Sequence, residues 1–563
     1  MSKRFTVGAV ATAAVLALTV TGMAVPASAE PTTVRTFTVV AEDGVSGDAA
    51  VAAIRSAGGT VVSRTDEVGV YQVTSDRADF AAKATTAGAL IGAAEQRAIG
   101  RKPKLDRVEQ EHLLAAATTK AAARKPGKRP AKMDPLDDKL WGLEMIRADK
   151  ARKVEPGDRR VTVGVLDTGV DASHPDIAPN FNWALSRNFA PDIPEIDGAC
   201  EVASCLDPVG TDDGGHGTHV AGTVGAAANG YGLSGVAPGV SLVNLKGGQD
   251  SGYFFLNPVV NALLHAGRSG LDVVNMSFYV DPWLYNCTAN PADSPEAQAA
   301  QRATIRAMKR ALTFAHNRGV TLVGALGNNH EDLGDPRADS SSPNYGDVAP
   351  YPREIDNDSC WDLPTEGPHV VSVSSVGPSG EKAAYSNYGT EQTAIAAPGG
   401  WYRDGFGTDT FRTDANMILS TYPKKVLQEE GAVDEDGDIV PGAETFVFKE
   451  CKKHGQCGYF TYLQGTSMAA PHASGVAALI VSRYGKSQGR GGYGLAPDSV
   501  ERHLLRTATA HACPEPRLRS YVDEGRPVEF DAYCDGPVKL NGFYGHGIID
   551  AYAAVTKPLK KSH

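Results

Sequence analysis

Several features that would place this chain in other protein classes are missing from its sequence. After the first 29 residues, no apolar run is long enough to span a membrane, so no membrane association is expected once that segment is removed. No Cys-x-x-Cys pair occurs, which argues against a cysteine-ligated metal cluster. No strong basic excess is present either. The formal net charge of −11 favours solubility and argues against a nucleic-acid partner.

The N-terminus is typical of a secretory signal peptide over residues 1–29. Lys3 and Arg4 form a short basic head, and an uncharged, apolar stretch covers residues 7–25. Residues 27–29, Ala-Ser-Ala, then provide a small-x-small cleavage site. An uncleaved membrane anchor is the alternative, but the small-residue exit follows the apolar run directly. The sequence therefore predicts a secreted, extracellular protein.

The cysteines favour disulfides, because an even number in a secreted chain is usually paired. Two pairs of cysteines are close enough in the sequence to form disulfides within one loop. Two longer bridges then follow by elimination, although sequence alone does not fix the connectivity. The expected pairs are Cys200/Cys205, Cys451/Cys457, Cys287/Cys360 and Cys513/Cys534.

With 563 residues the chain is too long for one ordinary domain. Residues 30–100 alternate short β-branched and Ala-rich runs in the order strand, helix, strand, strand, helix, which predicts a small α+β, ferredoxin-like unit. Residues 101–133 contain ten Lys or Arg against three acidic residues, which indicates an exposed linker. This segment is either a solvated spacer or a processing region, and the sequence does not decide between them.

Residues 134–563 have the pattern of an α/β fold. Near-continuous apolar strands separated by helical stretches, such as residues 295–317, predict a mostly parallel sheet with helices on both faces. Ligands bind such sheets at the carboxyl ends of the strands. The expected strands are residues 161–166, 241–245, 272–276, 320–326 and 370–376.

Three short glycine-flanked sequence motifs, called phrases below, supply a carboxylate, an imidazole and a hydroxyl. They are Val-Leu-Asp-Thr-Gly around Asp167, His-Gly-Thr-His from His216, and Gly-Thr-Ser-Met-Ala-Ala-Pro-His around Ser467. A serine hydroxyl needs an adjacent base, for which His216 is the candidate, and Asp167 would fix the tautomer of the imidazole. Ser467 is expected to open a helix, in whose first turn Pro471 would have no N–H partner to lose. Each phrase alone is weak evidence, whereas all three together favour an enzyme strongly.

Together the three phrases resemble the Asp, His and Ser blocks of the subtilisin-like serine proteases, whose triad follows this order along the chain. The resemblance covers roughly residues 134–555 and implies a serine peptidase acting on proteins or peptides. It also implies that the N-terminal unit is a prodomain, which acts as an intramolecular chaperone and inhibitor. No organic cofactor is implied, and we expect a monomer.

The resemblance extends to the oxyanion donor and to the substrate cleft. Gly327-Asn328 resembles the family's Gly-Asn block, which maps the donor onto Asn328. Ser277-Phe278-Tyr279 stands where the family usually has Ser-Leu-Gly, and this backbone is expected to pair with an extended substrate. Phe278 would form an apolar wall of the substrate cleft. Tyr279 and Leu326, the latter beside Gly327, would narrow the substrate pocket. Long insertions at residues 184–212, 280–300, 331–368 and 402–460 have no counterpart in compact family members.

A structural calcium ion is a further expectation from the resemblance. Residues 229–235 resemble the calcium loop of the family, and hard oxygen ligands suit Ca²⁺. Ordinary turn residues are the alternative interpretation. The expected ligands are the side chains of Asp137, Asp176 and Asn229 and the carbonyls of Tyr231 and Leu233.

These observations predict a secreted serine endopeptidase made as a zymogen, which cleaves itself near residues 100–133 and acts through an acyl-enzyme. Two other functions remain open. One is an exo-acting or peptide-ligating acyl-transfer enzyme on the same scaffold, and the other is a binding protein that has kept the fold. The sequence does not define the side-chain preference, the biological substrate, the maturation site or the calcium occupancy.

Overall fold

The computed structural model describes residues 34–97, 134–345, 348–453, 455–488 and 492–560. The expected signal peptide and the whole of the expected linker lie outside these residues. Within the described part of the chain, no helix is long and apolar enough to cross a membrane.

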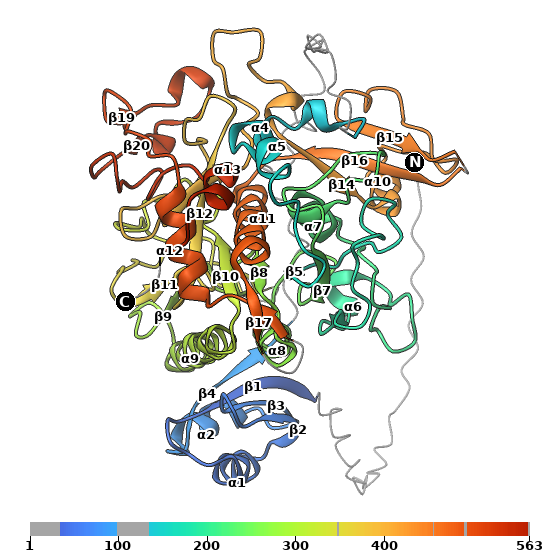
Figure 1. The fold of residues 1–563 in the computed structure, drawn as a ribbon. Helices are drawn as coiled ribbons and strands as arrows, with labels where there is room; N and C mark the ends of the chain where they lie inside the picture. Colours follow the sequence, from blue (N-terminus) through green and yellow to red (C-terminus); the bar gives the residue numbers. More distant parts are fainter. Residues whose placement is uncertain (1–33, 98–133, 346–347, 454, 489–491, 561–563) are drawn as a thin grey trace, which may run out of the picture.

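A small α+β unit precedes the main body (Figure 1). Its strands form one antiparallel sheet in the order β2-β3-β1-β4. Phe37, Ile54 and Phe80 fill its core, because the apolar residues of the sheet and of the two helices face each other. The elements are β1 (Arg35–Ala41), α1 (Gly47–Ala57), β2 (Thr60–Thr65), β3 (Val70–Ser75), α2 (Phe80–Thr86) and β4 (Leu90–Gln96).

The main body is built on a seven-stranded parallel sheet of order β13-β12-β10-β8-β5-β7-β6. This confirms the parallel α/β architecture that the sequence predicts. The strands are β5 (Thr162–Asp167), β6 (Arg187–Asn188), β7 (Ser241–Lys246), β8 (Val273–Met276), β10 (Thr321–Ala325), β12 (Val370–Val376) and β13 (Ile395–Pro398).

Helices cover both faces of this sheet. Successive strand residues point to opposite faces, so Val273 packs in one core and Val274 in the other. The first core contains α7 (His216–Gly225) and α11 (Thr466–Tyr484), which contact each other. The second contains α8 (Leu256–Ser269) and α9 (Pro295–Asn317). Further helices, at the carboxyl end of the chain, are α12 (Pro497–Thr507) and α13 (Ala551–Thr556).

The small unit packs against α8 and α9, below them in Figure 1. Val40, Val68 and Val70 join the second core of the main body. Polar contacts surround this apolar patch. The Arg310 guanidinium donates to the Val68 carbonyl at 3.0 Å and pairs with Asp43 at 2.6 Å.

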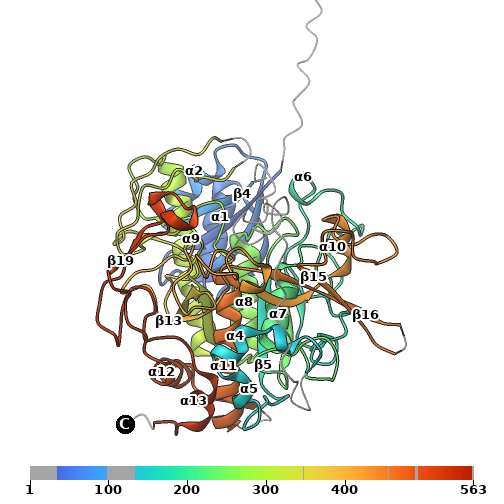
Figure 2. The ribbon, with the colours of Figure 1, turned by 90° about the horizontal axis from the view of Figure 1, so that it is seen from above.

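The insertions form small structures around the sheet, and three disulfides constrain all four of them, because two bridges lie within an insertion and Cys287–Cys360 joins the other two. The bridges Cys200–Cys205, Cys287–Cys360, Cys451–Cys457 and Cys513–Cys534 confirm all four expected pairs. The hairpin of β15 (Val447–Cys451) and β16 (Cys457–Leu463) extends from the body on the right of both views (Figures 1 and 2). The remaining elements are η1 (Asp137–Lys139), α4 (Trp141–Met145), α5 (Ala148–Ala151), α6 (Pro194–Asp197), β9 (Asn286–Cys287), β11 (Cys360–Trp361), η2 (Asp414–Asn416), β14 (Ile418–Tyr422), α10 (Lys424–Glu429), β17 (Lys486–Gln488), β18 (Gly492–Gly494), β19 (Leu518–Arg519), η3 (Val522–Glu524), η4 (Val528–Phe530) and β20 (Ala532–Tyr533).

Candidate active site

Asp167 and His216 meet at the carboxyl edge of the parallel sheet. Asp167 is the last residue of β5 and is fully buried, and His216 is the first residue of α7. Oδ1 of Asp167 accepts hydrogen bonds from Nδ1 of His216 at 2.7 Å and from the Thr168 N–H at 2.8 Å. A carboxylate can only accept, so the proton lies on Nδ1. The other ring nitrogen, Nε2, is then the one that can act as a base.

Asp212 fixes the start of α7, a role that sequence reasoning missed. Its Oδ1 accepts from the Thr168 hydroxyl at 2.9 Å and the Gly215 N–H at 2.9 Å, and its Oδ2 accepts from the Thr218 N–H at 2.9 Å. This buried carboxylate therefore ties the residue after Asp167 to the turn before His216. The only feature of the sequence that could have indicated this role is the Asp-Asp-Gly-Gly run directly before His216.

Ser467 lies in the first turn of α11, against the end of β8. Its Oγ lies 3.4 Å from the Ser277 carbonyl oxygen, and the Ser277 hydroxyl donates to the Ser467 carbonyl at 3.1 Å. Because α11 begins at Thr466, Pro471 lies in the second turn, which corrects the prediction that it has no N–H partner to lose. The proline removes the N–H that would bond the Ser467 carbonyl, and Ser277 bonds it instead.

Asn328 is held beside Ser467 by the same helix turn. Its side-chain carbonyl accepts from the Thr466 N–H at 2.9 Å and from the Thr466 hydroxyl at 3.0 Å. The Thr466 hydroxyl oxygen in turn accepts from the Gly327 N–H at 3.0 Å. These bonds fix the carbonyl end of the amide, so its NH₂ end must point the opposite way as a donor. The Ser467 N–H is a second donor, since first-turn N–H groups lack an intrahelical acceptor.

The expected substrate residues follow the ends of β8 and β10. Phe278 stacks on Phe254 with ring centroids 4.0 Å apart, and Phe278 and Tyr279 are both partly exposed. Leu326 is fully buried and packs with Tyr285 and Leu333, so its side chain belongs to a small core behind the end of β10.

The loop expected to bind calcium meets Asp176. The Asp176 carboxylate accepts from the Asn229 side-chain amide at 3.0 Å and from the Leu233 N–H at 3.0 Å. Asp134, which sequence reasoning missed, accepts from the Gly230 N–H at 2.7 Å on the same loop. Burial raises the pKa of Asp176 to about 8 and that of Asp134 to about 6, so a cation here would relieve unfavourable buried charge.

Asp137 does not join this group. Both of its oxygens accept from Ser234, one from the N–H at 2.9 Å and the other from the hydroxyl at 2.7 Å. The Arg152 guanidinium lies 3.7 Å away. The expectation that Asp137 is a calcium ligand stays a prediction, which these contacts disfavour because a hydroxyl, an amide and a cation already surround its carboxylate.

Other carboxylates gather near the start of α7 and around β7. One group is Asp192, Glu201 and Asp207, and a second is Asp207, Asp213 and Asp250. The buried Lys246 lies between them, with Nζ 3.1 Å from Asp207 and bonded to Asp250. Lys425 also pairs with Asp213, at 2.5 Å, and with Glu201, at 3.7 Å, so lysines already supply cations to these acidic groups.

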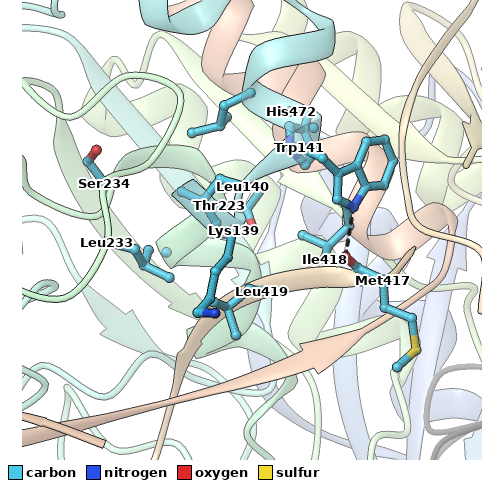
Figure 3. Close-up of a pocket in the computed structure, with 13 residues that line it drawn as sticks. Lys139, Leu140, Trp141, Thr223, Leu233, Ser234, Met417, Ile418, Leu419 and His472 are labelled. Carbon is cyan, nitrogen blue, oxygen red and sulfur yellow. Dashed lines mark hydrogen bonds between the residues drawn. The ribbon is translucent and has the colours of Figure 1, made fainter. Parts of the chain in front are cut away.

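A pocket is lined by residues of α4, of α7 and of the segment around β14, among them Trp141, Thr223 and Met417 (Figure 3). The Trp141 indole N–H donates to the Met417 carbonyl at 3.0 Å across it. None of Asp167, His216, Asn328 and Ser467 lines it. His472, which does, donates from Nδ1 to the Met468 carbonyl at 2.8 Å, and burial lowers its pKa to about 4.

A carboxylate-bound imidazole and a serine hydroxyl with amide donors at its side, all at one end of a parallel sheet, form the arrangement of a serine hydrolase. The particular kind follows from sequence comparison. The sequence model of the subtilase family matches residues 158–547, and the chain belongs to this family of serine peptidases, which hydrolyse peptide bonds.

Individual relatives agree with this assignment. The chain is 28% identical to subtilisin DY of Bacillus licheniformis over 369 residues, which are 66% of this chain and 91% of that protein. It is 30% identical over 344 residues to the major intracellular serine protease of Bacillus subtilis (strain 168), covering 61% of this chain and 74% of that protein. A solved structure of the epidermin leader peptide processing serine protease of Staphylococcus aureus has the same fold, with a TM-score of 0.59 and 21% identity over 94% of this chain and 100% of that chain.

Proposed function

We propose that this chain is a secreted serine endopeptidase, made as a zymogen, in which Asp167, His216 and Ser467 are the triad and Asn328 is an oxyanion donor. The observation that carries the proposal is the buried hydrogen bond between Asp167 and His216 at 2.7 Å, which leaves Nε2 of the imidazole as the base. Ser467 and Asn328 support it, since one helix turn holds both.

The chemistry follows from these contacts. His216 takes the Ser467 hydroxyl proton on Nε2 while Oγ attacks the substrate carbonyl carbon. The Asn328 amide and the Ser467 N–H donate to the oxyanion that forms. His216 then gives its proton to the leaving amine as the C–N bond breaks, and water hydrolyses the acyl-enzyme by the same route. Asp167 stabilises the imidazolium in both steps.

The substrate is proposed to bind as an extended strand. The backbone of Ser277, Phe278 and Tyr279 follows the end of β8 beside Ser467, which supports the pairing of an extended substrate with this segment at the nucleophile. An added strand gains main-chain hydrogen bonds and aims alternate side chains into pockets. Gly327 would border the pocket for the residue before the scissile bond, since Asn328 follows it.

The zymogen part of the proposal rests on the N-terminal unit. It has its own core and packs against α8 and α9 through Val40, Val68 and the Asp43–Arg310 pair. Such a surface could stabilise these two helices while the slow-forming parallel sheet assembles. The signal peptide of residues 1–29 and a maturation site within residues 101–133 complete this proposal.

Calcium is proposed as a structural ion, as is common in the subtilase family. Asp176 and Asn229 would hold it, with the loop carbonyls of Tyr231 and Leu233 and with Asp134 nearby in place of Asp137. The ion would supply positive charge to a buried carboxylate and so stabilise the loop.

The test of the proposed function is maturation of the Ser467→Ala variant. The wild-type chain should appear outside the cell without its N-terminal unit, whereas Ser467→Ala should keep that unit as an unprocessed precursor. A control, Ser482→Ala at the other end of the same helix, should mature normally, because among the described residues its hydroxyl bonds only the Ala478 carbonyl and the Asp158 N–H. Normal processing of Ser467→Ala would contradict self-cleavage. Mass spectrometry of products from long peptides separates the alternatives, because ligation gives new peptide bonds and exo-cleavage removes residues only from the ends.

A further inference from the structure

Asp362 is a buried carboxylate that the catalytic chemistry does not use. It follows β11, its exposed fraction is 4%, and its Oδ1 has no hydrogen-bond partner among the residues that the structure describes. No lysine or arginine of the described chain forms an ion pair with it. Burial raises its pKa well above the usual range, and the nearby Glu366 adds to this effect. A buried carboxylate without a counter-ion lowers the stability of the fold, so we expect Asp362 to bind a cationic partner.

The position of Asp362 is next to the oxyanion residue. A Cβ added to Gly327 would lie 3.5 Å from Oδ2 of Asp362, and Gly327 immediately precedes Asn328. A side chain at position 327 would meet the Asn387 amide at 2.5 Å, so only glycine leaves this space open. The carboxylate is therefore separated from the cleft by a residue without a side chain.

Both edges of the proposed substrate cleft are bonded to the segment that carries Asp362. The Val280 N–H, just after Tyr279, donates to the Leu363 carbonyl at 2.8 Å. The Thr365 hydroxyl donates to the Ala325 carbonyl at 2.6 Å, at the end of β10. Asp362 thus lies between the strand edge that would bind the substrate backbone and the strand that leads to Asn328.

The segment is also held firmly in place. The Cys287–Cys360 disulfide and the pairing of β9 with β11 anchor it two residues before Asp362. The Glu366 carboxylate accepts from the Asp362 N–H at 2.7 Å. A preorganised charge in a dry site binds its partner more strongly than one that must first be ordered.

We propose that Asp362 forms the floor of the pocket for the side chain before the scissile bond, so that this peptidase cleaves after lysine or arginine. The inference rests on the proposed function, because it assigns a substrate class to the same site. A guanidinium or ammonium group would reach the unpartnered Oδ1 and neutralise the buried charge. The chain's own predicted processing segment fits, since residues 101–133 contain ten Lys or Arg.

The experiment compares kcat/KM for four peptides that differ only at the residue before the scissile bond: arginine, lysine, citrulline and leucine. Citrulline keeps the shape of arginine and removes its charge. We expect the wild-type enzyme to prefer arginine over citrulline by about 100-fold or more, because the citrulline complex leaves a buried carboxylate uncompensated. Asp362→Asn should lose about 100-fold or more on arginine and lysine and change little on citrulline and leucine.

Two controls keep the outcomes distinct. A small fluorophosphonate that does not enter the pocket should label Ser467 at equal rates in the wild-type and Asp362→Asn enzymes. Labelling without any preference for arginine over citrulline overturns the pocket assignment and leaves the proposed function standing, whereas absence of labelling in the wild-type enzyme contradicts the proposed function itself. Should Asp362→Asn fail to fold, the wild-type comparison of arginine with citrulline decides alone.

Discussion

Replacing Asn328 by alanine removes one of the two proposed oxyanion donors and is the sharpest test of the catalytic geometry. Loss of a single donor of this kind raises the barrier by about 2.7–4 kcal/mol, so kcat should fall by about 100- to 1000-fold. KM should change much less, because the hydrogen bond forms to the oxyanion and hardly to the bound substrate.

The structure also predicts a side effect on stability. The Asn328 carbonyl accepts from the N–H and the hydroxyl of Thr466, so alanine leaves a buried N–H without its acceptor. That loss costs about 1–3 kcal/mol of folding free energy. Asn328→Asp separates the two effects. It keeps the acceptor for Thr466 but replaces the donor by an oxygen that repels the oxyanion, so stability should be nearly retained while kcat falls at least as far as in Asn328→Ala.

The assay is steady-state hydrolysis of one peptide by each purified variant, with active sites counted by fluorophosphonate titration and stability followed by thermal unfolding. Folded Asn328→Ala enzyme with kcat within about threefold of wild type would refute the reasoning, since loss of one oxyanion donor lowers kcat by about 100-fold or more. So would an Asn328→Asp variant that turns over faster than Asn328→Ala.

Two further predictions concern stability, and both are measured in the Ser467→Ala background to prevent autolysis. Calcium should raise the unfolding temperature of the parent and of Asp137→Asn by several degrees but not that of Asp176→Asn, because Asp176 bonds the Asn229 amide whereas Ser234 and Arg152 hold Asp137; an equal shift in all three proteins would contradict the assignment. The buried His472 has a folded pKa of about 4 against 6.5 for the free side chain, so the unfolded chain binds the additional proton and stability should fall as the pH drops from 6.5 to 4. His472→Gln should reduce that slope by up to about 1.4 kcal/mol per pH unit in urea unfolding, and an unchanged slope would show that this imidazole titrates normally.

Local patterns in the sequence were sufficient for the regular elements. The apolar period of residues 295–317 predicts α9, and the β-branched runs predict the central strands, because one side of each helix and both faces of each inner strand are buried. Glycine-flanked corners also located Asp167, His216 and Ser467, since a residue at a strand end or helix start must lie at the edge of the sheet.

Contacts between distant segments were beyond the reach of those patterns. Asp137 and Asp134 are three residues apart, and only the packing of Ser234 and Arg152 decides that the first bonds to Ser234, at the end of the loop, and not to Gly230. The effect of Pro471 depends on where α11 begins. Because the helix begins at Thr466, the proline leaves the Ser467 carbonyl without its intrahelical donor, and the Ser277 hydroxyl donates to that carbonyl instead. Asp362 has no motif at all, and its place beside Gly327 arises from a disulfide-anchored insertion.

Labelling of the secreted protein with a fluorophosphonate, followed by peptide mass spectrometry, tests the central claim most directly. The account predicts one adduct, on Ser467, that is absent from Ser467→Ala and strongly reduced in His216→Ala, because the hydroxyl is activated only by the imidazole that Asp167 holds. A processed, folded protein that forms no adduct, or forms it on another residue, would contradict the account and favour a binding protein on the same fold.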